Sequence, residues 1–199
     1  MRLLIATTNL DKLREIRHLL AAVPVDLLSL RDFPAVPEPD ETGTTFQENA
    51  RQKALYYDRS LRPDAATVAE DSGLVVDALN GAPGVYSARF VRPDASYPER
   101  FAEILRGLQG LPEAARSARF VCAVAVVRRG NVIYETTGTV EGVIADAARG
   151  EDGFGYDPIF YYPPYGKTLG EVSEREKLSV AHRGVAFRQL AVSLPMMGM

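Results

Sequence analysis

The stretch that decides the fold runs from residue 118 to residue 145 and reads ARFVCAVAVVRRGNVIYETTGTVEGVIA. Its first arm, FVCAVAVV (residues 120–127), is an unbroken apolar run, which is typical of a strand buried on both faces. Gly130 and Asn131 then mark a turn, and the chain returns through a second strand-like arm. A long hairpin of this kind needs antiparallel pairing, so the sheet that contains it is not purely parallel.

Helical and strand-like patterns are mixed on both sides of this hairpin. Apolar residues at helical spacing follow Asn9, a good N-cap residue, and a second helix begins where Thr45 and Glu48 have the spacing of a capping box. The stretch ATVAEDSGLVVDAL (residues 66–79) predicts a short strand, a turn at residues 70–73 and then another apolar run. The other expected elements are a strand at 2–8, a helix at 97–109, one C-terminal helix from about residue 180 to 194, and a frayed tail, SLPMMGM, at 193–199.

These patterns predict an α/β fold with a long central mixed β-sheet flanked by helices. A chain of 199 residues is long enough to bury one sizeable core. No linker or low-complexity tract interrupts it, so we expect a single domain over residues 1–199. We further expect two lobes within that domain, with an active cleft between them.

The composition excludes several classes of partner. The chain is 46% hydrophobic and has a formal net charge of −3. A mildly acidic chain lacks the broad positive field that non-specific DNA or RNA binding needs. The apolar N-terminal stretch is too short for a signal peptide or a membrane span, and one cysteine, Cys122, makes no intramolecular disulfide and no cysteine-based zinc site. We therefore expect a soluble, cytoplasmic protein that binds neither nucleic acid nor membranes and buries Cys122 in its core.

The segment TTNLDK (Thr7–Lys12) is a candidate phosphate site. A strand that passes through a hydroxyl-rich turn into a helix leaves backbone N–H groups free at the positive end of the helix dipole. A cation in the first helical turn, such as Lys12, is mildly unfavourable unless an anion binds beside it. The alternative interpretation is an ordinary N-cap with Lys12 in solvent. The Walker A pattern of P-loop proteins is absent from the sequence.

Two acidic pairs are candidate metal ligands. Asp40-Glu41 precedes Thr42-Gly43, and Glu70-Asp71 precedes Ser72-Gly73. A few hard carboxylate oxygens are what Mg²⁺ uses when substrate phosphates supply its other ligands. Acids are also common in solvated turns, which is the alternative interpretation. Glu70-Asp71 is the better candidate because it directly follows an apolar strand.

A third group of residues suits a nucleobase. In GFGYDP (Gly153–Pro158), two glycines allow the backbone to approach a ligand, Phe154 offers an aromatic face and Asp157 accepts hydrogen bonds from a ring N–H. Aromatic residues at a strand entrance are otherwise usual core residues. Lys177 and the pair His182-Arg183 do not share a helix face, so a common role requires Lys177 to lie at or before the start of the helix.

Together these segments resemble one family, the inosine triphosphate pyrophosphatases, which hydrolyse non-standard purine nucleoside triphosphates. The resemblance extends in order from about residue 3 to residue 190. Six motifs in register are much more specific than any one of them. They are TTNLDKLREI, DETGTTFQENARQKA, AEDSGLVVDAL, GAPGVYSARF, GFGYDPIF and EKLSVAHRGVA.

The resemblance implies Mg²⁺-dependent hydrolysis of ITP, dITP and XTP to the monophosphate and pyrophosphate, which keeps these bases out of DNA and RNA. It also implies a homodimer. The residue roles that it implies fall into three sets. They are Thr7, Thr8, Asn9, Leu10, Asp11 and Lys12 for the phosphates, with Lys53 and Ser72 also on the substrate side; Glu41 and Asp71 for the metal, with Asp71 as the catalytic proton acceptor; and Phe154, Gly155, Tyr156, Asp157, Lys177, His182 and Arg183 for the nucleobase.

The sequence departs from the family pattern at two places. Position 70 is Glu where many bacterial members have Asp, which leaves open how Glu70 and Asp71 share metal ligation. The phosphate turn has Thr8 where Gly is frequent. Two other functions compete with the family reading. One is a Maf-like pyrophosphatase for pyrimidine or modified nucleotides, and the other is a nucleotide-binding protein without catalysis.

Overall fold

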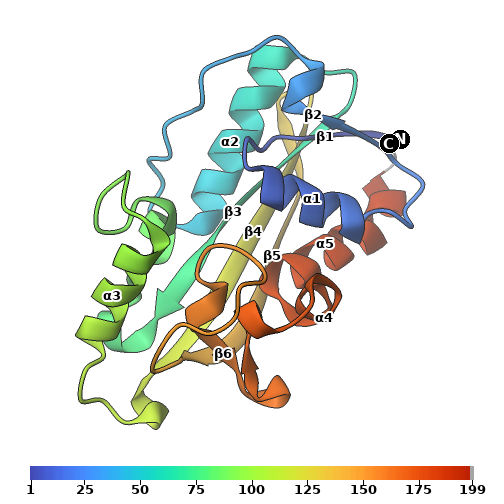
Figure 1. Cartoon of the computed structure of the whole chain (residues 1–199). Helices are drawn as coiled ribbons and strands as arrows, with labels where there is room; N and C mark the ends of the chain where they lie inside the picture. Colours follow the sequence, from blue (N-terminus) through green and yellow to red (C-terminus); the bar gives the residue numbers. More distant parts are fainter. Residues whose placement is uncertain (198–199) are drawn as a thin grey trace. The chain divides into compact units, whose positions relative to one another are not determined.

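The structure, a computed structural model, describes residues 1–197 (Figure 1). It is an α/β fold, and short 3₁₀ turns connect many of its helices and strands. The strands are β1 (Arg2–Ile5), β2 (Asp26–Ser29), β3 (Ala66–Val76), β4 (Ser117–Arg128), β5 (Asn131–Ile144), β6 (Phe160–Tyr162) and β7 (Lys167–Thr168). The helices are α1 (Leu10–Leu19), α2 (Phe46–Leu61), α3 (Tyr97–Gly107), α4 (Glu174–Val180) and α5 (His182–Ser193).

The seven strands form one open sheet in the order β2-β1-β3-β4-β5-β6-β7. β1 pairs in parallel with both β2 and β3, whereas β6 pairs antiparallel with both β5 and β7. The predicted hairpin is formed by β4 and β5, the two long neighbouring strands of Figure 1. In β4, every residue from Cys122 to Val127 is buried, as expected for a strand covered on both faces. The predicted mixed sheet flanked by helices is therefore confirmed.

The chain divides into two compact units. Unit 1 contains residues 1–71, 122–138 and 182–197, and unit 2 contains residues 72–121 and 139–181. β3, β4 and β5 each contribute residues to both units. Each unit has its own apolar core. Leu3, Ile5, Ile16, Val68, Val124, Phe187 and Leu190 are core residues of unit 1, and Leu74, Ile104, Leu108, Ile159, Phe160 and Leu169 are core residues of unit 2.

The turn predicted at residues 70–73 is wrong, because β3 continues without a break from Ala66 to Val76. The acidic and glycine residues of this segment are typical of turns, but β3 lies between β1 and β4 in the sheet. The pairing of β3 with β1 ends at Val68, so pairing with β4 and nearly complete burial are what outweigh the local turn preference. Glu70 and Asp71 consequently lie inside a central strand instead of in a loop.

The C-terminal region also differs from the prediction. It contains two helices, because Ala181 takes an extended conformation (φ −66°, ψ 154°) between α4 and α5. Lys177 therefore lies before the start of α5, as a common role with His182 requires. The tail does not fray where the structure describes it, since Leu194–Met197 forms a 3₁₀ turn and Leu194 is buried in the core of unit 1. Residues 198 and 199 of the expected frayed tail lie outside the described residues.

Candidate active site

The predicted phosphate turn joins β1 to α1 in unit 1. Asn9 caps α1 as predicted, with its side-chain oxygen accepting the N–H groups of Asp11 at 2.9 Å and Lys12 at 3.1 Å. Lys12 is not solvated as the alternative interpretation required, because its Nζ lies 2.5 Å from Oε1 of Glu70. Thr7, Thr8 and Leu10 line a hollow of about 330 Å³ in the same unit. The turn thus caps α1 and also lines a hollow that solvent can enter.

Glu70 is the centre of a buried ionic network. Besides Lys12, its carboxylate contacts Nη2 of Arg183 at 3.3 Å and Sγ of Cys122 at 3.2 Å, and Nη1 of Arg183 lies 2.6 Å from Glu15. Burial raises the pKa of Glu70, but the Lys12 ammonium and the Arg183 guanidinium outweigh it and hold that pKa well below its usual range. Glu70 therefore remains ionised and neutralises two cations.

Asp71, the next residue of β3, has the opposite electrostatic environment. Burial and the nearby Glu41 carboxylate raise the pKa of Asp71 from 3.8 to about 6, although the Lys53 ammonium opposes them. The amide Nδ2 of Asn49 donates to Oδ2 of Asp71 at 3.0 Å. An aspartate that titrates near neutral pH is suited to accept a proton in general-base catalysis.

Lys53 connects the two acidic segments that the sequence singled out. Its Nζ lies 2.5 Å from Oε1 of Glu41 and 3.3 Å from the carbonyl oxygen of Glu70. Burial lowers the pKa of Lys53, but Glu41 and Asp71 raise it by more, so the ammonium stays charged. Glu41, Lys53, Glu70 and Asp71 are therefore brought together in unit 1, as the sequence predicted.

The carboxylates of this site differ in how well they suit a divalent cation. Among residues 1–197, no three His, Cys, Asp or Glu side chains are grouped so as to hold a metal ion by themselves. Glu41 and Asp71 nevertheless fit one, because both offer hard carboxylate oxygens. Burial and the Glu41 charge raise the pKa of Asp71, and a cation would offset both effects by stabilising the ionised carboxylate. Glu70 fits less well, since Lys12 and Arg183 already neutralise its carboxylate.

The nucleobase candidates divide between the units. In unit 2, Nζ of Lys177 lies 2.6 Å from Oδ2 of Asp157 and 4.4 Å from the centre of the Phe154 ring, and the Phe154 N–H donates to the same carboxylate oxygen at 2.8 Å. Gly155, between them, has a φ of +68°, which other residues rarely adopt. Tyr156 is a core residue, as the alternative interpretation held, and its hydroxyl donates to the carbonyl of Ser87.

The remaining candidates are placed as follows. Ser72 continues β3 into unit 2. His182 and Arg183 form the first turn of α5 in unit 1, where both are buried. Arg183 belongs to the ionic network with Glu15 and Glu70. Cys122 is fully buried as predicted, and burial together with the Glu70 charge raises the pKa of its thiol well above the usual range.

Sequence reasoning missed two residues of this site, Asn49 and Glu15, and it missed the contact of Cys122 with Glu70. Asn49 did carry a signal, since it is four residues before Lys53 and so lies on the same helix face. Glu15 lies three residues after Lys12 in the same helix, but its partner Arg183 is 168 positions away in the chain. A contact at that separation has no local signature.

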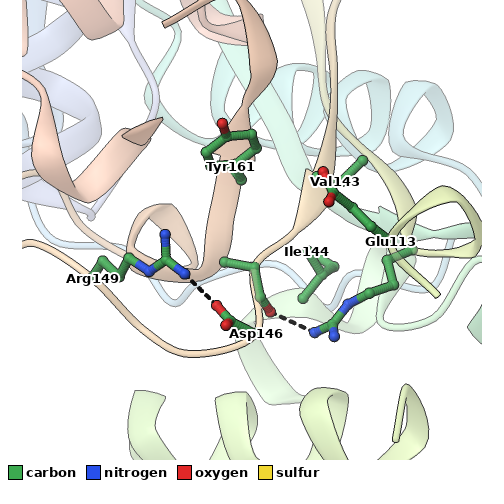
Figure 2. A pocket seen from close by; sticks show the side chains of 8 residues that line it. Glu113, Val143, Ile144, Asp146, Arg149 and Tyr161 are labelled. Carbon is green, nitrogen blue, oxygen red and sulfur yellow. Dashed lines mark hydrogen bonds and ion pairs between the residues drawn. The ribbon is translucent and has the colours of Figure 1, made fainter. Parts of the chain in front are cut away.

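A second hollow, in unit 2, contains none of the predicted site residues (Figure 2). It has a volume of about 280 Å³ and includes Arg116 and Arg149 in its lining. Figure 2 shows Arg149 paired with Asp146, and the guanidinium of Arg116 donates to the carbonyl of Ala145 at 2.5 Å. Its two arginines are balanced by Asp146 and Glu113, so it lacks the excess positive charge that a polyphosphate requires.

Fold and site together define an α/β protein with an open mixed sheet, in which carboxylate and ammonium groups from α1, α2 and a loop surround two acids of the central strand β3. The Ham1 family model matches residues 3–193. A dITP/XTP pyrophosphatase from Geobacillus kaustophilus is 47% identical over 94% of this chain and 91% of that protein, and one from Exiguobacterium sp. is 46% identical over 98% and 97%. The structure of a HAM1 protein from Coxiella burnetii has a TM-score of 0.88 at 37% identity and covers 98% of this chain and 99% of that one.

The chain therefore belongs to the Ham1 family, which confirms the resemblance found in its sequence motifs. None of the helices within the described part of the chain is long and apolar enough to cross a membrane.

Proposed function

We propose that this protein hydrolyses dITP, XTP and ITP to the nucleoside monophosphate and pyrophosphate, and so keeps these bases out of DNA and RNA. Membership of the Ham1 family and the names of its relatives from Geobacillus kaustophilus and Exiguobacterium sp. support the reaction. The observation that carries it is the cluster of Glu41, Lys53 and Asp71, in which an aspartate with a pKa of about 6 lies beside a partly buried ammonium.

In this function Glu41 and Asp71 would hold Mg²⁺, and the ion would supply charge neutralisation for the phosphate oxygens and the pyrophosphate leaving group. Asp71 is also the group that accepts a proton from the attacking water, a role worth roughly 10²- to 10⁴-fold in rate. Glu70 acts on the side of the substrate by holding Lys12 in place instead of sharing the metal equally with Asp71.

Two lysines and the phosphate turn bind the triphosphate. Lys12 and Lys53 are compact point charges, which suits them to phosphate oxygens. Thr7 and Thr8 add hydroxyl groups, Leu10 lines the same hollow as they do, and Asn9 holds the turn by accepting the N–H groups of Asp11 and Lys12. Ser72 adds a hydroxyl next to Asp71. All of these except Ser72 belong to unit 1.

The nucleobase is recognised by a separate group of residues. In unit 2, Phe154 supplies an aromatic face and the Lys177 ammonium, held by Asp157, supplies a donor, while Gly155 allows the backbone turn between them. Arg183 instead holds Glu15 and Glu70 in unit 1. A donor directed at the 6-keto oxygen favours hypoxanthine and xanthine, because the 6-amino group of adenine would bring donor against donor. Buried polar mismatches of this kind discriminate by about 10⁴- to 10⁵-fold.

We also propose that the protein is a cytoplasmic homodimer, on the strength of the family resemblance. Sedimentation velocity of the purified chain tests the dimer. A single species at the monomer mass would contradict it.

The experiment that tests the function is pyrophosphate release from ITP, XTP, dITP, ATP, GTP, CTP and UTP, each with and without Mg²⁺. We expect release only with the metal, and a kcat/KM for the first three at least about 10⁴-fold above that for the other four. Turnover confined to CTP and UTP would support the Maf-like alternative. Tight binding of ITP without release from any nucleotide would support a non-catalytic binding protein.

A further inference from the structure

Asn49 contacts two segments that carry different functional carboxylates. It lies in the first turns of α2, is completely buried, and belongs to unit 1 together with all of its partners. Its Oδ1 accepts the backbone N–H of Gly43 at 2.8 Å, and its Nδ2 donates to Oδ2 of Asp71 at 3.0 Å. Gly43 is two residues from Glu41, so one side-chain amide links the Glu41 loop to Asp71.

The orientation of this amide is fixed by its partners. A backbone N–H can only donate, so the oxygen of Asn49 must face Gly43 and the nitrogen must face Asp71. α2 itself is held at its start by a capping box, in which Thr45 accepts the N–H of Glu48 and the Glu48 carboxylate accepts the N–H of Thr45. Asn49 therefore projects from a rigid support.

The backbone at Gly43 is shaped to receive Asn49. A Cβ atom at Gly43 would lie 2.6 Å from Oδ1 of Asn49 and 2.7 Å from Cβ of Glu48, both closer than real side chains allow. Only glycine permits this approach of the loop to α2. The contact therefore depends on both residues, because it needs a glycine at position 43 and a side-chain amide at position 49.

We propose that Asn49 is a positioning residue, whose single amide holds the loop that carries Glu41 and sets the plane of the Asp71 carboxylate, so that the two acids face the same reacting phosphate. This inference rests on the proposed function, because it assigns Asn49 a role in the same reaction. Misplacing a reacting group by about 1 Å costs on the order of 100-fold in rate. Loss of the amide should accordingly lower kcat by about that factor.

Two substitutions separate the two contacts. Asn49→Asp keeps an acceptor for Gly43 but replaces the donor to Asp71 with an oxygen, so we expect kcat for dITP to fall about 100-fold while KM changes by less than about threefold. Asn49→Ala removes both contacts. In that variant we expect the same loss of kcat and, in the protein without metal or nucleotide, at least about tenfold faster hydrogen exchange of the Gly43 amide, which Asn49→Asp leaves protected.

The matched control is Asp58→Ala on the same helix. Asp58 is also buried, and its carboxylate accepts the N–H of Gly130 at 2.7 Å, outside the site. We expect this variant to lose thermal stability but to keep the wild-type kcat and the protected Gly43 amide. A kcat for Asn49→Asp equal to that of Asp58→Ala, or unchanged Gly43 exchange in Asn49→Ala, would overturn the inference. If the wild type itself released no pyrophosphate, the proposed function would fail, while the exchange data would still report on the Gly43 contact.

Discussion

Glu70 and Asp71 are neighbours on β3, yet their surroundings move their carboxyl pKa values in opposite directions. Lys12 and Arg183 keep the pKa of Glu70 well below its usual range, whereas burial and Glu41 raise the pKa of Asp71 to about 6. Adjacent acids whose pKa values are driven apart usually have different roles. Glu70 is a permanent anion that fixes cations, and Asp71 is a group that exchanges a proton.

The raised pKa of Asp71 makes a prediction about stability as well as rate. Because its pKa in the folded state, about 6, exceeds its ordinary value of 3.8, ionisation of Asp71 destabilises the folded state by an amount that grows between these two pH values and is complete above pH 6. Asp71→Asn removes that charge. We expect this variant to lose turnover but, in buffer without divalent cations, to melt at a higher temperature than the wild type at pH 8.

This advantage should shrink as the pH falls through 6 toward 4, where the wild-type Asp71 binds its proton and is neutral as well. Calorimetry of both proteins between pH 4 and pH 8 measures it. The same difference in melting temperature at pH 4 and pH 8 would mean that the charge of Asp71 does not destabilise the folded state. Retained turnover in Asp71→Asn would mean that Asp71 is not the proton acceptor.

At the scale of elements, three elements of unit 1 meet through one buried ionic network. Glu15 of α1 and Glu70 of β3 both contact Arg183 of α5, and the side chains of all three are about 2% exposed. Removing one partner of a buried ion pair leaves an uncompensated charge, which costs about 3–5 kcal/mol. Glu15→Gln should therefore lower the free energy of unfolding by about 3 kcal/mol, as measured by urea denaturation.

A surface ion pair gives the comparison for this change. Glu135 pairs with Arg51 at 2.8 Å, but both side chains are about one-third exposed or more. Glu135→Gln should cost less than about 1 kcal/mol, since exposed pairs are weak. Equal losses for the two glutamine variants would mean that the buried network does not link α1 to α5.

The elements that could be predicted from the sequence are those whose signals are local. The capping residues Asn9 and Thr45 mark the starts of α1 and α2, and the apolar run of β4 with its glycine turn marks the hairpin. The turn expected at residues 70–73 was wrong because the pairing of this part of β3 with β4 has no signal in the local sequence. The break at Ala181 was missed because no glycine or proline marks it.

At the scale of the whole molecule, the candidate residues form two groups of different chemistry. The acidic residues Glu41, Glu70 and Asp71 lie in unit 1 together with Lys12 and Lys53. The contact of Lys177 with Asp157 and Phe154 lies in unit 2. Each group was predictable where it follows a short motif. Asn49, Glu15 and the partners of Arg183 were not, because they depend on which distant segments the fold brings together.

Substitutions in these two groups should have different effects on kcat/KM. Lys53 contacts Glu41 and the backbone of Glu70, so Lys53→Ala should reduce kcat/KM for dITP, ITP and ATP by similar factors, because a triphosphate is common to all of them. Lys177→Ala alone would leave the buried carboxylate of Asp157 uncompensated. The cleaner variant is the double substitution Lys177→Met with Asp157→Asn, which removes both charges.

For the double variant we expect the ratio of kcat/KM between ITP and ATP to fall at least tenfold, because the donor that distinguishes a 6-keto from a 6-amino group is lost while the phosphate residues remain. Steady-state kinetics with both nucleotides measures the ratio. If kcat/KM fell equally for ITP and ATP, so that their ratio did not change, Lys177 and Asp157 would stabilise the fold and would not recognise the base. A ratio that fell in Lys53→Ala as well would mean that phosphate binding and base recognition cannot be assigned to separate residues.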